Sequence, residues 1–279
     1  MVLLAALLWG TTGTARALAP SDAAPLAVGA VRIAIGGALL VIIALVRGGL
    51  IGPRWPLGPA AVAATAVAIY QLSFFEGVAR VGVAVGTILA IGSAPACAGA
   101  LGWLVLRERP TTRWLASTAI AVSGLVLLVL QSGTAISTPA AVVLPLIAGA
   151  GYAVYATASK RLLRAGDAVS VAAIGFGGGA LLLIPVLLVA DLRWLADPRG
   201  AAVAIELGVF ATALAYILFT RALVRLPVSW GATLSLAEPL TASLLGVVVL
   251  GESLTTLQLA GAGLVAAGLI VLATARSSS

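Results

Sequence analysis

Ten long runs of apolar residues follow one another along the chain, separated by short connections rich in glycine, proline and arginine. A helix needs about 20 apolar residues to cross the hydrocarbon core of a bilayer, and each run comes close to that length. The pattern therefore predicts ten transmembrane helices joined by short loops, without a separate soluble domain. The predicted spans cover residues 2–19, 27–46, 57–79, 82–106, 112–131, 139–159, 168–190, 201–223, 228–250 and 255–275.

The second half of the chain repeats the first. With an offset of 144 residues, 95–128 aligns with 239–272, and fourteen of the thirty-four positions are identical, with Glu108 aligned to Glu252. Five spans per half is an odd number, so the second half is expected to insert upside down, as in many carriers. The sequence thus predicts an all-α integral membrane protein with ten transmembrane helices in two inverted five-helix repeats, residues 1–134 and 135–279.

Basic residues predict the orientation of these spans. With the N-terminus inside, the inner loops and the tail at Arg276 carry eleven basic residues, and the outer loops carry three. Because cytoplasmic loops hold the excess of Lys and Arg, we expect both termini in the cytoplasm, with the protein in a bacterial inner membrane. The basic loops follow the second and fourth spans of the first half but the first and third of the second half, which supports the inversion.

Composition then excludes several classes of function. Of the 279 residues 62% are hydrophobic and only 9% charged, so lipid is the main solvent. The chain has no histidine and one cysteine, Cys97, and it contains no phosphate loop, HExxH, CxxC or GxSxG motif. The net charge of +7 is spread between the spans instead of forming a patch for nucleic acid. We expect no catalytic residues, metal, cofactor or nucleic-acid partner, and no direct use of ATP.

Two prolines and a glutamate lie near the middle of predicted spans. Proline cannot donate to the carbonyl four residues earlier, and free carbonyls at membrane depth must meet protein or a wet cavity. We predict that Pro95 and Pro239 are hinges beside a substrate site; a static kink is the alternative. A charge at Glu238 costs about 2.5–3.5 kcal/mol. Glu238 therefore either orders the substrate or accepts a proton. The alternative is a structural carboxyl group bonded to the backbone that is freed at Pro239.

Aromatic residues recur with helical spacing in the first, third, sixth and eighth spans, mostly beside a polar neighbour. A few polar groups in an aromatic cavity suit a small amphipathic solute, whereas ordinary helix packing is the alternative. The candidate substrate-binding residues are Trp9, Thr12, Tyr70, Phe74, Tyr152, Tyr155, Ser159, Tyr216, Ser235 and Glu238.

Other polar and aromatic residues are expected to have structural roles. Arg32 lies deep in the second span, where anchoring is favoured over attraction of a substrate carboxylate. Glu76 and Glu206 are expected to lie at the membrane interface, paired with Arg80 or with water. Four tryptophans near span ends predict an interfacial belt. They are Trp55, Trp103, Trp114 and Trp194.

A duplicated motif gives the chain a family resemblance. The first copy reads Pro95…Leu101-Gly102…Leu106-Arg107-Glu108, and the second reads Glu238-Pro239…Leu245-Gly246…Leu250-Gly251-Glu252. With Arg32 early in the second span, this set resembles the EamA-type drug/metabolite transporter (DMT) superfamily, and within it the YddG-type amino-acid exporters. The copies depart from each other at Ala94, which aligns with Glu238, and at Arg109-Pro110.

The resemblance implies a secondary carrier whose central cavity is lined by spans 1–4 and 6–9, with spans 5 and 10 outside. We therefore expect a transporter and not an enzyme. It would be secondary active or facilitative and export small metabolites, amino acids above all, by alternating access. Carriers for sugars, nucleotides or cationic drugs, a channel, and a membrane-embedded lipid-modifying enzyme are the alternatives. Membrane lipid is the other expected partner, while coupling to protons or a counter-substrate and the oligomeric state stay open.

Overall fold

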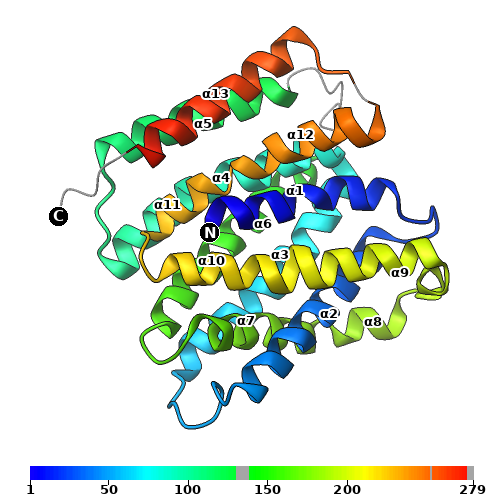
Figure 1. The fold of residues 1–279 in the computed structure, drawn as a ribbon, viewed down its shortest axis with the longest axis vertical. Helices are drawn as coiled ribbons and strands as arrows, with labels where there is room; N and C mark the ends of the chain where they lie inside the picture. Colours follow the sequence, from blue (N-terminus) through cyan, green and yellow to red (C-terminus); the bar gives the residue numbers. More distant parts are fainter. Residues whose placement is uncertain (130–137, 252, 275–279) are drawn as a thin grey trace.

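The computed structural model describes residues 1–129, 138–251 and 253–274, and all regular secondary structure in those ranges is helical (Figure 1). Seven helices are long and apolar enough to cross a membrane, and two shorter apolar helices, Thr112–Leu128 and Ala168–Leu182, accompany them. The proposed boundary between the repeats at 134, as well as Glu252 and Arg276, lies outside the described residues.

The first half contains five helices whose ends fall within a few residues of the predicted spans. They are α1 (Val2–Ala17), α2 (Pro25–Val46), α3 (Leu57–Val81), α4 (Val83–Leu106) and α5 (Thr112–Val129). Pro25 begins α2, where its missing N–H costs no helical hydrogen bond. Gly82 alone separates α3 from α4, with a φ of 81° that favours glycine and lets the chain reverse in one residue.

Two of the predicted spans in the second half are interrupted, and a third changes its helical winding without a break. Span 168–190 forms α7 (Ala168–Leu182) and α8 (Ile184–Val189), and span 228–250 forms α11 (Val228–Leu234) and α12 (Ala237–Leu250). Span 201–223 runs through α9 (Pro198–Ile205), a π-helix η2 (Glu206–Leu214) and α10 (Ala215–Leu223). The remaining elements are α6 (Pro139–Leu162), the 3₁₀ turn η1 (Arg193–Ala196) and α13 (Thr256–Ala273).

Asp167 starts α7 by capping it. Its carboxylate accepts from the backbone N–H of Val169 at 2.9 Å and from the Ser170 hydroxyl at 2.6 Å. Partial burial acts to raise the pKa of Asp167, but these hydrogen bonds outweigh it and hold the pKa below its usual value. The cap therefore fixes the turn between α6 and α7.

Helices far apart in sequence pack together to form the bundle. α1 packs on α12, α4 on α6, α2 on α7, and α3 on both α6 and α7, while η2 lies against α1 and α2. α5 and α13 run side by side at one edge of the bundle, as expected for spans 5 and 10 (Figure 1). Their backbones touch through glycines: a Cβ added at Gly124 would lie 2.5 Å from the Gly261 carbonyl oxygen. Small residues allow this close approach in membranes.

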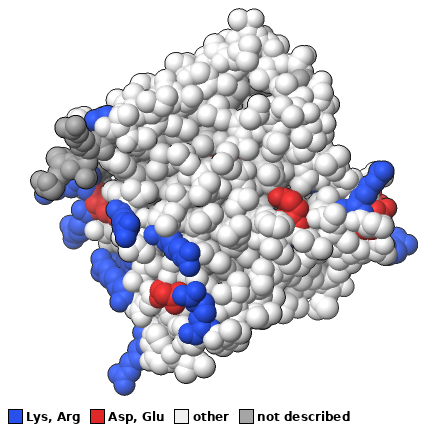
Figure 2. Space-filling model, viewed as in Figure 1, with Lys and Arg blue, Asp and Glu red and all other residues white. Residues whose placement is uncertain are grey.

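Most of the charged side chains visible in Figure 2 gather toward the ends of the helices, and the broad band between them is uncharged apart from one acidic patch. Large apolar side chains are exposed along the helices, including Leu104, Leu188 and Val189, and lipid is the solvent that suits such a surface. Most of the visible Lys and Arg residues lie at the end formed by connections 47–56, 107–111, 163–167 and 224–227. We call this the basic end.

Glu108 ties three helices together at the basic end. One carboxylate oxygen, Oε1, lies 2.8 Å from Lys160 Nζ, and the other, Oε2, accepts from the backbone N–H of Val228 at 2.8 Å. Lys160 also donates to the Leu226 carbonyl at 2.5 Å. These bonds join the end of α4 to the end of α6 and the start of α11.

Two expectations about residues near the interface are wrong. Trp114 and Trp194 are buried in protein, at 4% and 2% exposure, and the Trp114 indole donates to Thr233 at 2.9 Å. Glu206 turns inward: Oε1 accepts from Thr11, and Oε2 is buried. Nearness to a span end does not distinguish a lipid-facing from a protein-facing side. The pairing of Glu76 with Arg80 is confirmed, at 2.6 Å.

Candidate functional site

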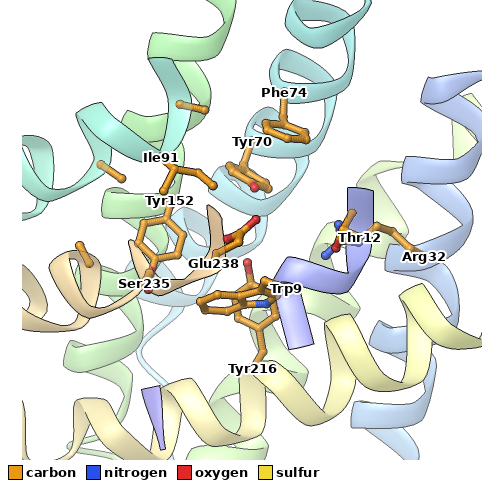
Figure 3. A pocket seen from close by; sticks show the side chains of 13 residues that line it. Trp9, Thr12, Arg32, Tyr70, Phe74, Ile91, Tyr152, Tyr216, Ser235 and Glu238 are labelled. Atoms are coloured by element: carbon orange, nitrogen blue, oxygen red, sulfur yellow. The ribbon is translucent and has the colours of Figure 1, made fainter. Parts of the chain in front are cut away.

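A cavity with a volume of about 550 Å³ lies among the central turns of the helices. Figure 3 shows side chains from both halves of the chain converging on it. Its lining residues are Trp9, Thr12, Arg32, Tyr70, Phe74, Ala90, Ile91, Ala94, Tyr152, Tyr216, Ala232, Ser235 and Glu238.

Eight of the ten candidate substrate-binding residues line this cavity. They are Trp9, Thr12, Tyr70, Phe74, Tyr152, Tyr216, Ser235 and Glu238. Tyr155 instead lines a second, smaller chamber that adjoins the first, and Ser159 lines neither. Ser159 shares the face of Tyr152 on α6, but seven residues of helix place it about 10 Å farther along the axis. It is therefore buried away from both spaces.

Aromatic rings form much of the cavity wall. The Trp9 ring lies 5.0 Å from that of Tyr216, and Tyr70 stacks on Phe74 at 5.6 Å. The Tyr152 hydroxyl bonds to Ser235 Oγ at 2.9 Å. Because Ser235 Oγ also donates to the Gly231 carbonyl, Tyr152 is the donor in this pair and keeps acceptor capacity toward the cavity.

A helix break positions Glu238 at the cavity. α11 ends at Leu234 and α12 begins at Ala237, so the span is interrupted beside Pro239. Pro239 has no backbone N–H to donate to the Ser235 carbonyl. This carbonyl instead accepts a hydrogen bond from the backbone N–H of Glu238 at 2.9 Å. The freed carbonyl is thus satisfied by the backbone and not by the carboxyl group. Glu238 sits in the first turn of α12, where the helix dipole favours a carboxylate.

The two prolines behave differently. α4 continues as one helix through Pro95, whereas the equivalent span is broken next to Pro239. Neither proline lines the cavity, but the residue before each one, Ala94 or Glu238, does so. The hinge role of both prolines stays a prediction.

Arg32 is the charged lining residue that the sequence did not place among the site residues; Ala90, Ile91, Ala94 and Ala232 also line the cavity without having been candidates. Arg32 is 5% exposed, and its guanidinium donates to Thr212 Oγ1 at 3.2 Å and to the Ala211 carbonyl at 3.4 Å. These contacts with η2 fit the expected anchoring. Within the described ranges no carboxylate lies at ion-pair distance from Arg32, and the guanidinium has five donors. The position of Arg32 deep within an apolar span was the feature of the sequence that could have indicated its place in the cavity.

Arg32 and Glu238 face the same cavity from different helices (Figure 3). The described part of the chain offers the Glu238 carboxylate no salt bridge or side-chain hydrogen bond. The cavity therefore combines one cationic group, one anionic group, hydroxyls and aromatic walls. Such a set can hold a small zwitterion without covalent chemistry.

The adjoining chamber has a volume of about 280 Å³. It shares Arg32, Tyr70, Tyr152 and Tyr216 with the main cavity and is otherwise lined by Ile33, Val67, Gln71, Tyr155 and Phe176. Among the residues that the structure describes, no cluster of three or more His, Cys, Asp or Glu side chains is placed to hold a metal ion.

Comparisons with known proteins agree on one family. The model described as "EamA-like transporter family" matches residues 1–130 and 139–274. The chain is 42% identical over 274 residues to the uncharacterized transporter YwfM of Bacillus subtilis, covering 98% of this chain and 93% of that protein. A probable terminal-alkyne amino-acid exporter of Streptantibioticus cattleyicolor is 30% identical over 211 residues, or 75% of this chain and 70% of the relative.

Two further similarities are narrower in what they show. The threonine/homoserine exporter RhtA of Escherichia coli K12 is 38% identical over 128 residues, which is 44% of this chain and 42% of RhtA. A solved structure described only as "Crystal structure of protein" superposes with a TM-score of 0.84 at 21% identity, covering 98% of this chain and 96% of its own. That likeness shows a shared fold.

Proposed function

This chain belongs to the EamA-like transporter family and is an integral membrane transporter, and we propose that it exports small amino acids across the bacterial inner membrane. The observation that carries the proposal is the single cavity onto which Arg32 and Glu238 both face. A substrate carboxylate binds Arg32, and the ammonium group lies toward Glu238. An α-amino acid supplies both charges within a few ångströms.

The names of two relatives support the choice of amino acids. One is a probable terminal-alkyne amino-acid exporter, and the other is a threonine/homoserine exporter. Sugars and nucleotides lack the adjacent ammonium and carboxylate groups, and cationic drugs offer no partner to Arg32. The charge pattern of the cavity therefore favours zwitterions over these other solutes.

We further propose ten membrane spans in two inverted repeats, residues 1–134 and 135–279. The pattern of helix contacts supports this arrangement. If the halves are exchanged, the pairing of α1 with α12 maps onto that of α6 with α4, and α2 with η2 maps onto α7 with α3. The pairs α2–α7 and α5–α13 each map onto themselves. A two-fold axis in the membrane plane produces this symmetry.

The basic end is proposed to face the cytoplasm, with both termini on that side. Transport then proceeds by alternating access, in which the repeats rock around the cavity and Pro95 and Pro239 take up the bending. Opening toward the cytoplasm requires the bonds of Glu108 to Lys160 and Val228 to break, since they join the two halves at that end. Transport is secondary active or facilitative, with the substrate gradient, a proton or a counter-substrate as the driving force.

Uptake into proteoliposomes tests the proposal. Purified protein is reconstituted and supplied with a panel of labelled amino acids, with and without a pH gradient, beside protein-free liposomes. We expect saturable uptake that is accelerated by the same amino acid on the opposite side. Uptake of only sugars, nucleotides or cationic drugs would overturn the substrate class. Unsaturable flux without counter-substrate acceleration would instead indicate a channel.

A further inference from the structure

The smaller chamber holds a polar group that the proposed function does not use. Gln71 on α3 is 2% exposed and lines this chamber, and neither its amide oxygen nor its amide nitrogen has a hydrogen-bond partner in the described part of the chain. Buried side-chain amides in proteins are normally paired. An unpaired amide facing a cavity is therefore free to form hydrogen bonds with a ligand atom or with water.

The position of this amide is set by the neighbouring helix. A Cβ added at Gly29 of α2 would lie 2.3 Å from Gln71 Nε2, so only a glycine leaves space for the amide there. The close approach of α2 limits movement of the amide on that side. The amide is thus held at the chamber by backbone packing and not by hydrogen bonds of its own.

The rest of the chamber is mainly apolar and narrow. Ile33, Val67 and Phe176 contribute hydrocarbon surface, and tyrosine rings complete much of the wall. The space within it is about 280 Å³ together with its opening, so any side chain that enters has to be short. The polar side chains that line it are those of Gln71, Arg32 and the tyrosines, Tyr155 among them.

Arg32 links the chamber to the main cavity because it lines both. A carboxylate bound to its guanidinium lies at the junction of the two spaces. The ammonium group then points to Glu238 in the main cavity, and the side chain of the same amino acid enters the smaller chamber.

We propose that the smaller chamber is the side-chain subsite of the carrier, and that Gln71 selects amino acids whose short side chain ends in a neutral hydrogen-bonding group. This inference rests on the proposed function. An amide both donates and accepts, so it matches a hydroxyl or a second amide. A hydrocarbon side chain of equal size leaves the amide unpaired, and a site built around a hydrogen bond discriminates strongly against such an analogue.

Threonine and valine provide the test because they differ by a hydroxyl in place of a methyl group. Counterflow of both is measured in proteoliposomes for the wild type, Gln71→Met and Ser73→Ala. Ser73 is a matched control: it is buried on the same helix, bonds only to carbonyls of α3, and lines neither space. We expect wild type and Ser73→Ala to prefer threonine by about tenfold or more, and Gln71→Met to lose that preference.

The outcomes separate the two proposals. If the wild type carries no amino acid, the proposed function fails. If the wild type carries amino acids but Gln71→Met lowers threonine and valine equally, Gln71 has a structural role and the subsite is refuted. Unchanged transport of both amino acids by Gln71→Met would show that the amide meets only water, which also overturns the inference. Gln71→Asn, which keeps the amide on a shorter chain, should restore part of the preference if Gln71→Met folds poorly.

Discussion

Replacement of Arg32 tests how the cavity holds its substrate. Arg32→Met removes the guanidinium while keeping an unbranched apolar side chain, and Arg32→Lys keeps the charge but loses the planar fork that grips a carboxylate. Removing one partner of a desolvated, hydrogen-bonded charge pair costs about 2–5 kcal/mol. At about 3 kcal/mol, amino-acid affinity falls about hundredfold in Arg32→Met. We expect an intermediate loss in Arg32→Lys.

The variant is expected to fold because the bonds that it loses are long. Arg32 donates at 3.2 Å to Thr212 and at 3.4 Å to the Ala211 carbonyl, at or beyond the upper end of the usual range. Their loss is partly offset because a buried charge is removed as well. The net change in the free energy of unfolding should stay within about 2 kcal/mol. The thermal unfolding midpoint of the detergent-purified protein checks this.

Binding is measured for an amino acid and for the matched amino alcohol, which lacks the carboxylate. Arg32→Met should weaken binding of the amino acid about hundredfold and change binding of the alcohol little. Arg80→Met is the control, since Arg80 is exposed, paired with Glu76 and outside both cavities. Equal losses for the two ligands in Arg32→Met would refute the reasoning and leave Arg32 as a helix anchor.

Three further changes probe the charge and the moving parts. Glu238→Gln should lower amino-acid flux in vesicles about tenfold without unfolding the protein. The control Glu76→Gln should leave the flux unchanged. Wild-type flux in Glu238→Gln would remove Glu238 from the site. Pro95→Ala restores an N–H to α4 and should slow exchange between inward- and outward-open states, as followed by cysteine accessibility; an unchanged rate would mean a static kink. Glu108→Gln weakens the bond to Lys160 and should raise the accessibility, from the basic end, of cysteines introduced into the cavity lining. Unchanged labelling would contradict a closing role for this bond.

Hydropathy predicts the spans well because lipid thickness dictates their length. The ends of α3 and α4, for example, fall within two residues of the predicted 57–79 and 82–106. Hydropathy carries no information about backbone hydrogen bonds, so the interruptions at Leu183 and at Ser235 and the π-helix η2 did not appear in the sequence pattern. Both breaks had a proline as a local signal, Pro185 two residues after Leu183 and Pro239 four residues after Ser235, whereas η2 had none.

The residues that line the cavity could be predicted from the sequence where they share one face of a single helix. Trp9 with Thr12, and Tyr70 with Phe74, reach the cavity together because three- or four-residue spacing keeps them on one side. Depth along a helix and partners from distant segments were not predictable. The contact of Arg32 with Thr212 spans 180 residues of sequence, and no local pattern encodes it.

The π-helix η2 makes the cavity sensitive to the length of its span. The Thr212 hydroxyl donates to the carbonyl of Leu207, five residues earlier, at 2.7 Å, within this wider winding. Each residue of an ordinary helix advances the side-chain direction by about 100°. Losing one residue between 206 and 214 would leave an apolar segment of nearly the same hydropathy, yet it would swing the Tyr216 ring away from Trp9. A deletion that no hydropathy plot would register could therefore dismantle the aromatic wall.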